Sequence, residues 1–230
     1  MPYFLIDYWY LVLVLPAVLF SLVAQIKVKS TFSKYSRVAG RLTGRAASET
    51  ILRTAGLSVP VKSVGGSLTD HYDPRTNEIR LSEPVYDKAT VAAVGVAAHE
   101  TGHALQYAEG YGPIRLRTAI VPVTNIASTI SPYLVILGLV LSLEPLAYLG
   151  VALFFMAVLF QLITLPVEFN ASARAMRALR EQAVLSEEEL KGAKKVLTAA
   201  AMTYVAALFV SLMSFLRLLL IVSGRGRRNR

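Results

Sequence analysis

Two of the three histidines in this chain lie four residues apart, in the stretch His99-Glu100-Thr101-Gly102-His103. Because residues i and i+4 share one face of a helix, both imidazoles can reach a single zinc ion. Glu100 can then reach a metal-bound water and act as a general base in peptide hydrolysis. The competing interpretation is a helix with two histidines and no metal. The uncharged residues around the motif favour the zinc site.

A catalytic zinc ion usually has three protein ligands and an open position for water. The chain has no cysteine, so the third ligand must be a histidine or a carboxylate. Pro166 can start a helix, and Glu168 would then lie in its first turn, either as a ligand or as a partner of the helix dipole. We expect Glu168 to bind the metal, which gives a gluzincin-like His-His-Glu set. His71, the remaining histidine, is the alternative ligand.

The composition is that of a membrane protein. Hydrophobic residues make up 54% of the 230 residues, and the mean hydropathy is +0.51, which is too apolar for an ordinary soluble domain. The net charge of +9 could indicate nucleic acid. In so apolar a chain, anionic lipid headgroups are the expected partners of the charge, and we predict no nucleic-acid binding.

Four apolar segments are long enough to be membrane helices. The first has aromatic residues but no Lys or Arg at its start and no small-residue cleavage site after it, which argues against a signal peptide. The expected organisation is an N-terminal transmembrane helix (1–26), a cytosolic portion with the zinc helix (27–117), a transmembrane hairpin (118–167), a cytosolic helix with the third ligand (168–197), a membrane helix (198–222) and a basic tail (223–230).

Lys and Arg residues predict the orientation. They follow the first span, precede the second and fill the connection between the third and fourth, so the positive-inside rule places these three regions in the cytosol. The basic tail conflicts with this rule if the fourth segment spans the bilayer. Either the rule has one exception here, or the fourth segment is re-entrant or interfacial. We expect a multi-pass protein of the plasma membrane whose active site faces the cytoplasm.

The polar portion is expected to be a small zincin-like α+β unit. The sequence predicts an amphipathic helix over 31–55, a β-hairpin within 59–81 and a buried helix over 88–107 capped by Asp87. The hairpin offers an edge strand, placed at 67–71, that could pair with an extended peptide or be purely structural. Leu68, Asp70 and His71 are the candidate substrate contacts. The fold class is therefore mainly α, with about four membrane helices and a short hairpin.

Beyond these patterns, the chain resembles the YugP-like neutral zinc metallopeptidases, a bacterial membrane family. The string Leu-Thr-Asp-His-Tyr-Asp-Pro at 68–74 is far more specific than the zinc motif. Further matching stretches are Thr43-Gly44 with Ala47 and Glu49, Arg80-Leu81-Ser82, residues 96–106, Gly110-Tyr111 and Leu165-Pro166-Val167-Glu168-Phe169. The resemblance implies a zinc-dependent peptidase with His99 and His103 as ligands and Glu100 as catalytic acid/base.

The layout is also similar to that of the HtpX-type membrane metallopeptidases, in which a membrane hairpin separates the zinc helix from a glutamate ligand. That similarity implies ligation by Glu168. Two positions depart from the expected patterns. Ser172 stands where the HtpX-type pattern has an aspartate, and Asn170 stands where YugP-like chains are expected to have an acid.

Three functions compete. The first is a membrane-anchored zinc endopeptidase that cleaves membrane or membrane-proximal polypeptides. The second is a non-catalytic scaffold or adaptor that retains the zincin fold. The third is an ion transporter, which would need ionisable groups near the bilayer midplane, and the apolar segments hold almost none apart from Arg217. The complete zinc motif favours the endopeptidase.

Overall fold

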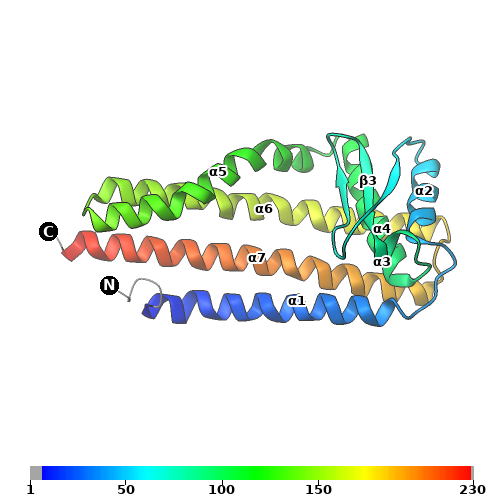
Figure 1. Cartoon of the computed structure of the whole chain (residues 1–230), viewed down its shortest axis with the longest axis horizontal. Helices are drawn as coiled ribbons and strands as arrows, with labels where there is room; N and C mark the ends of the chain where they lie inside the picture. The colour runs from blue at the N-terminus through cyan, green and yellow to red at the C-terminus, as the bar shows by residue number, and fades with distance from the viewer. Residues whose placement is uncertain (1–6, 229–230) are drawn as a thin grey trace. The chain divides into compact units, whose positions relative to one another are not determined.

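The computed structural model describes residues 7–228, and the chain is mainly α-helical, as the sequence predicts (Figure 1). The helical elements are η2 (Tyr10–Val14), α1 (Leu15–Tyr35), α2 (Gly44–Thr54), α3 (Glu83–Tyr86), α4 (Val91–Ala108), α5 (Gly112–Val140), α6 (Glu144–Glu181) and α7 (Glu187–Arg228). The strands are β1 (Val61–Val64), β2 (His71–Asp73) and β3 (Glu78–Ser82).

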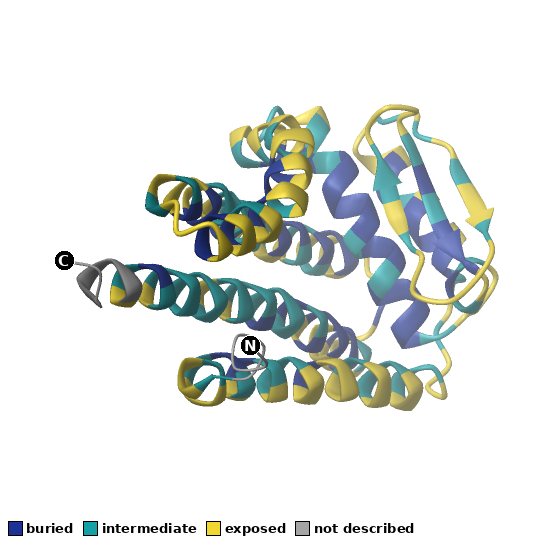
Figure 2. Ribbon diagram, turned by 60° about the vertical axis from the view of Figure 1, so that its left-hand side comes forward, coloured by how far each residue is buried: buried dark blue, intermediate teal, exposed yellow. Residues whose placement is uncertain are grey.

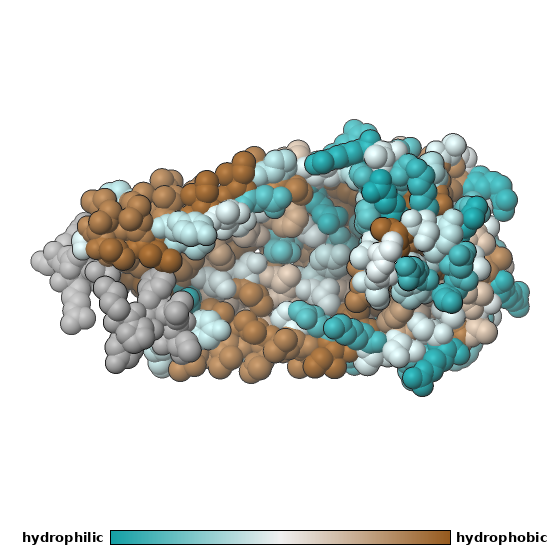
Figure 3. Space-filling model, viewed as in Figure 1, coloured by the Kyte–Doolittle hydropathy of each residue, from teal (hydrophilic) through white to brown (hydrophobic). Residues whose placement is uncertain are grey.

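The chain divides into two compact units. The first comprises Met1–Ala24, Leu116–Leu165 and Thr203–Arg230, and the second comprises Gln25–Arg115 and Pro166–Met202. Within residues 7–228, four helical stretches are long and apolar enough to cross a membrane: Tyr10–Tyr35, Gly112–Val140, Glu144–Glu181 and Glu187–Gly224. Hydrophobic residues cover much of the visible surface of the helices of the first unit (Figure 3).

Small residues hold the predicted membrane hairpin together. A Cβ atom added to Gly138 would lie 2.4 Å from the backbone nitrogen of Ala147, so only glycine allows α5 and α6 to approach this closely. Ser131 Oγ donates a hydrogen bond to the carbonyl of Gly150 at 2.9 Å. Pro122 and Pro132 both lie inside α5 without ending it.

The fourth apolar segment is part of one continuous helix, α7, which disagrees with a re-entrant segment. Near its end, Arg217 Nη2 donates to Asp7 Oδ2 at 2.8 Å, and its guanidinium lies 5.4 Å from the ring centre of Tyr10. Asp7 also accepts a hydrogen bond from the backbone N–H of Tyr10 at 2.8 Å. This pair joins the start of the first span to the last helix.

The predicted helix over 31–55 is wrong, because the structure has two helices there. α1 continues to Tyr35, and α2 begins after Thr43, whose side chain accepts a hydrogen bond from the backbone N–H of Ala46. Backbone hydrogen bonds between the intervening loop and the segment before α4 replace the helical ones, including Gly40 N–H to Ala89 O at 2.9 Å. Long-range pairing therefore overrides the helical pattern.

The hairpin is confirmed: β2 and β3 are antiparallel, with Tyr72 opposite Ile79. The sheet has a third strand that the sequence analysis missed, because β1 pairs with β3 in parallel. The predicted edge at 67–71 is wrong in extent, since β2 begins only at His71 and residues 67–70 form a loop. β2 remains an edge strand of the sheet.

Helix α4 lies at the centre of the second unit and is buried along most of its length (Figure 2). Val91, Val94 and Ala98 pack with residues of α2, α6 and α7, while Ala93 and Ala97 pack with β3 and α3. The cap of α4 is Thr90 rather than the predicted Asp87. Thr90 Oγ1 accepts a hydrogen bond from the backbone N–H of Ala93, and Asp87 instead ends α3.

Candidate metal centre

The two histidines of α4 lie next to each other on one face of the helix, as their spacing predicts. The ring centres of His99 and His103 are 4.8 Å apart, with the ring planes at 80°. The His103 side chain is only 10% exposed and that of His99 13%. A largely buried helix thus carries two imidazoles that need polar partners, because burying a polar group without a partner is costly.

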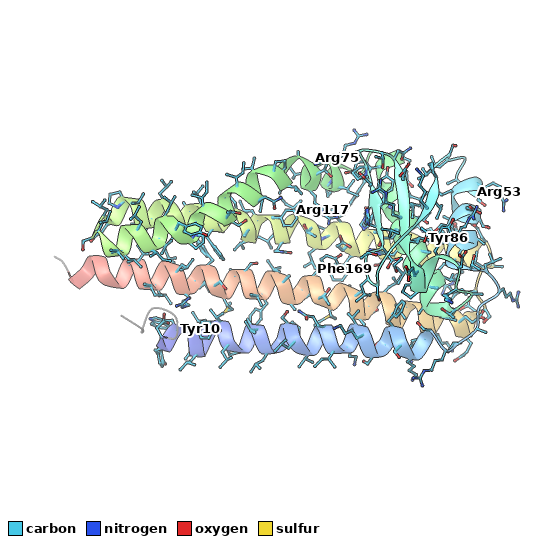
Figure 4. The ribbon with its side chains drawn as sticks, in the orientation of Figure 1. Tyr10, Arg53, Arg75, Tyr86, Arg117 and Phe169 are labelled. Atoms are coloured by element: carbon cyan, nitrogen blue, oxygen red, sulfur yellow. The ribbon has the colours of Figure 1, made fainter. Side chains whose placement is uncertain are left out.

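The third member of the site comes from α6. The expectation that Pro166 starts a new helix is wrong, since α6 continues through it from Glu144 to Glu181. Glu168 therefore lies far from a helix N-terminus, and the dipole explanation for its position no longer applies. Glu168 is 1% exposed, whereas its neighbour Phe169, labelled in Figure 4, is 46% exposed. The helix thus turns Glu168 inward.

One carboxylate oxygen faces both imidazoles. Glu168 Oε2 lies 3.2 Å from His99 Nε2 and 3.5 Å from His103 Nε2. One ligand atom from each residue can be chosen so that all three lie within 4.8 Å of one another. Tetrahedral zinc with bonds of about 2.0–2.1 Å separates its ligand atoms by roughly 3.3 Å. The spacing and the N, N, O donor set therefore fit a zinc ion.

The other ring nitrogen of each histidine has a side-chain partner. His99 Nδ1 lies 3.1 Å from Ser172 Oγ, and His103 Nδ1 lies 3.0 Å from Gln106 Oε1. Such outer contacts orient the histidines of metal sites. Sequence reasoning missed Gln106, although its spacing of three residues from His103 on a helix was a usable signal. Ser172, a departure from the HtpX-type pattern, lies directly at the site.

Glu100 is buried, and β2 holds its carboxylate. Its Oε2 atom accepts a hydrogen bond from the backbone N–H of Tyr72 at 3.1 Å. Burial alone lowers the pKa of His103. The hydrogen bond to Glu168 and the charges of Glu100 and Glu168 outweigh this effect and raise the pKa above its ordinary value. The site is thus an acidic environment that attracts a cation.

The three predicted substrate contacts lie in different environments. Asp70 accepts hydrogen bonds from the backbone N–H and the hydroxyl of Ser82, at 2.7 and 2.8 Å, and so ties the loop to the end of β3. His71 is exposed, with Nδ1 2.7 Å from the carbonyl of Thr69. Leu68 is 55% exposed and has φ of 61°. Leu68 and His71 thus remain accessible, while Asp70 has a structural contact.

Gly102 lets α4 and α6 approach each other at the site. The space over this residue is occupied by α6. A Cβ atom there would lie 2.5 Å from the carbonyl oxygen of Ala171. The added Cβ would be fixed to the backbone of α4, and the carbonyl belongs to the backbone of α6. Neither can therefore move aside without separating the two helices that carry the cluster.

Replacing Gly102 by alanine is therefore expected to lower the free energy of unfolding by about 1–3 kcal/mol, as overpacking does, and to weaken zinc binding. Gly95 on the same helix is the matched control, since its added Cβ would lie 3.4 Å from Ala193 Cβ. Gly95→Ala should be neutral or stabilising by up to about 1 kcal/mol through helix propensity. Denaturation of both variants in detergent measures the difference, and equal stabilities would contradict this account of Gly102.

Apolar helices of membrane-spanning length and a buried His-His-Glu group on two helices that could hold a metal ion are features expected of a membrane protein of the zinc-peptidase class. Comparison with known proteins agrees. Residues 10–223 match the family described as "Putative neutral zinc metallopeptidase". The chain is also 50% identical, over 207 residues, to the "Putative membrane protease YugP" of Bacillus subtilis (strain 168), covering 88% of this chain and 92% of that one.

The chain belongs to this family of neutral zinc metallopeptidases, which confirms the resemblance seen in the sequence. No solved structure matches it.

Proposed function

We propose that this protein is a membrane-anchored zinc endopeptidase in which His99, His103 and Glu168 bind the metal and Glu100 is the catalytic residue. The observation that carries the proposal is the convergence of two Nε2 atoms on one buried carboxylate oxygen, at 3.2 and 3.5 Å. The family and the name of the Bacillus relative support a membrane protease. The His-His-Glu set makes the site gluzincin-like.

When bound, zinc supplies a Lewis acid that polarises the peptide carbonyl and makes water a better nucleophile at neutral pH. Glu100 adds the proton transfer. Its carboxylate takes a proton from the attacking water and returns it to the nitrogen of the leaving amine. The backbone N–H of Tyr72 keeps this carboxylate in place. Burial of the surrounding helix keeps bulk water from competing for this hydrogen bond.

The substrate is proposed to bind as an extended segment beside β2. The side of β2 that does not pair with β3 carries the Tyr72 N–H, and this N–H points to Glu100. A peptide that adds to this edge would therefore lie next to the catalytic carboxylate. Leu68 offers an exposed apolar side chain and His71 an exposed imidazole to the substrate, while Asp70 holds their loop against Ser82.

Membrane or membrane-proximal polypeptides are the proposed substrates, cleaved on the cytoplasmic side of the plasma membrane. The charge pattern supports this orientation, because Lys and Arg residues follow the first apolar segment, precede the second and lie between the third and the fourth. If the continuous helix α7 spans the bilayer, the basic tail is an exception to the positive-inside rule. Membrane lipids are the expected surroundings of the apolar helices.

Chelation tests the proposal. The purified full-length protein in detergent should contain about one zinc ion per chain, and a chelator should abolish cleavage of an unfolded polypeptide such as casein until zinc is restored. His99→Ala should lose both zinc and activity. In proteoliposomes, a peptide tethered to a membrane anchor should be cleaved faster than the same peptide free in solution. Full activity in the chelated protein would refute the zinc mechanism, and equal rates would refute the membrane-proximal substrate.

A further inference from the structure

The polar contacts behind His103 form a chain of hydrogen bonds that runs from α4 to α6. His103 Nδ1 contacts Gln106 Oε1, and Gln106 Nε2 donates to the carbonyl of Val167 at 2.8 Å and to Asn170 Oδ1 at 2.9 Å. Asn170 Oδ1 also accepts from Arg174 Nε at 2.7 Å. Gln106 is fully buried, at 0% exposure, so its contacts with His103 and Val167 are made inside the protein, while the contacts of Asn170 are partly buried.

Donor and acceptor chemistry allows one direction along this chain. A glutamine amide has two N–H donors, and here both have partners, leaving the oxygen as the group that faces His103. The carbonyl of Val167 can only accept, so turning the amide round would place two oxygens against each other. Arg174 can only donate, and it therefore fixes the oxygen of Asn170 as the second acceptor for Gln106.

The direction of the amide decides the state of the histidine. Since Gln106 Oε1 can only accept, His103 Nδ1 must carry a proton, and in the neutral imidazole the lone pair is then on Nε2. Nε2 is the atom that lies 3.5 Å from Glu168 Oε2. Ser172 at His99 imposes no such choice, because a hydroxyl both donates and accepts.

We propose that Gln106 is a positioning residue for zinc: it holds His103 in the Nδ1–H form, and Val167, Asn170 and Arg174 fix its own orientation. This inference rests on the proposed function, because it requires His103 to bind the metal. The proposal is compatible with either an amide or an acid at position 170. Asn170 accepts from Gln106 and from Arg174 through its oxygen, and an aspartate would offer the same acceptor.

The test is zinc affinity, measured by competition with a chelator on the purified full-length protein. Gln106→Leu should bind zinc about 10–100-fold more weakly, the usual effect of losing an outer partner of a ligand. Thr101→Val is the matched control, because Thr101 is a fully buried polar residue of the same helix whose hydroxyl donates to the carbonyl of Ala97 within that helix. It should stay within about twofold of wild type.

Position 170 gives a second comparison. Asn170→Asp should keep zinc affinity close to wild type, whereas Asn170→Leu should weaken it. In the Gln106→Leu background, Asn170→Leu should have no further effect, because the two residues act through one chain of contacts. Additive losses would indicate a merely structural role and overturn the proposal.

The spectrum of the zinc-loaded protein reads the tautomer directly. With only three histidines in the sequence, ¹⁵N-histidine labelling should assign His103 as protonated at Nδ1 and metal-bound at Nε2. Binding through Nδ1, or equal zinc affinities of Gln106→Leu and Thr101→Val, would refute the role of Gln106. A wild-type protein without zinc would refute the proposed function itself, so the two failures are distinguishable.

Discussion

Replacing Glu100 by glutamine is expected to lower the rate of peptide cleavage about 10²–10⁴-fold, the usual contribution of a general acid–base group, while zinc stays bound. Glutamine has nearly the shape of glutamate, and its oxygen can still accept the hydrogen bond from Tyr72 N–H that holds β2. It cannot take a proton from water at neutral pH. The variant thus removes the proton transfer and preserves the fold and the metal ligands.

Cleavage assays and zinc analysis on the same preparation measure this result. Glu109→Gln is the matched control, since Glu109 ends the same helix, and its side chain is 58% exposed and pairs with Arg174. It should retain activity. A Glu100→Gln protein that cleaves normally would contradict the assigned mechanism. A variant that is inactive in vitro but fully replaces the natural protein in cells would favour the scaffold hypothesis instead.

Replacing Glu168 by alanine is expected to remove zinc from the site. The change deletes one of three proposed ligands, so the loss of affinity should exceed the roughly 10–100-fold cost of losing an outer contact. Zinc at about 1,000 times its Kd should stabilise the wild-type protein by about 4 kcal/mol. In Glu168→Ala, which leaves only the two histidines, this stabilisation should disappear, and cleavage with it.

Thermal unfolding with and without zinc measures the effect, because it compares each variant with its own metal-free form. Glu181→Ala serves as the control, since this glutamate ends the same helix and is exposed. It should show the full zinc-dependent shift. An undiminished shift in Glu168→Ala would mean that another residue completes the coordination sphere, with His71 the first candidate to test.

The elements of the fold could largely be predicted from local patterns. The length of the apolar runs predicted the membrane helices, and turn residues between Asp73 and Glu78 predicted the hairpin of β2 and β3. Prediction failed where distant segments decide the outcome. The helical pattern over 31–55 gives no sign that Val38 and Gly40 pair with the segment before α4. The parallel pairing of β1 with β3 is equally non-local.

Two predictions that rested on local rules, one for proline and one for helix caps, were wrong. Pro166 would end or start a helix in an isolated peptide, yet α6 passes through it, so Glu168 is positioned by a long helix instead of by a new N-terminus. Asp87 and Thr90 are both suitable caps, and only the structure shows that Thr90 makes the hydrogen bond.

The candidate site was easier to predict than its surroundings. A fixed helical spacing brings His99 and His103 together, and elimination of cysteine left few choices for a third ligand. The contacts of Gln106 and Ser172 depend on how α4 packs against α6, which Gly102 permits by leaving room for the carbonyl of Ala171. Nothing in the local sequence pattern specifies that packing.

The ion pair of Asp7 with Arg217 joins residues 210 positions apart, so it has a consequence for biogenesis. The carboxylate reaches the membrane early in synthesis, but its guanidinium partner arrives only with the last helix. A charge within or near the bilayer that lacks its partner is costly. The inserted part of the nascent chain is therefore less stable until α7 has inserted. A chain whose translation stops before Arg217 would lack the ion-pair partner of Asp7, and we expect such a truncated protein to be unstable.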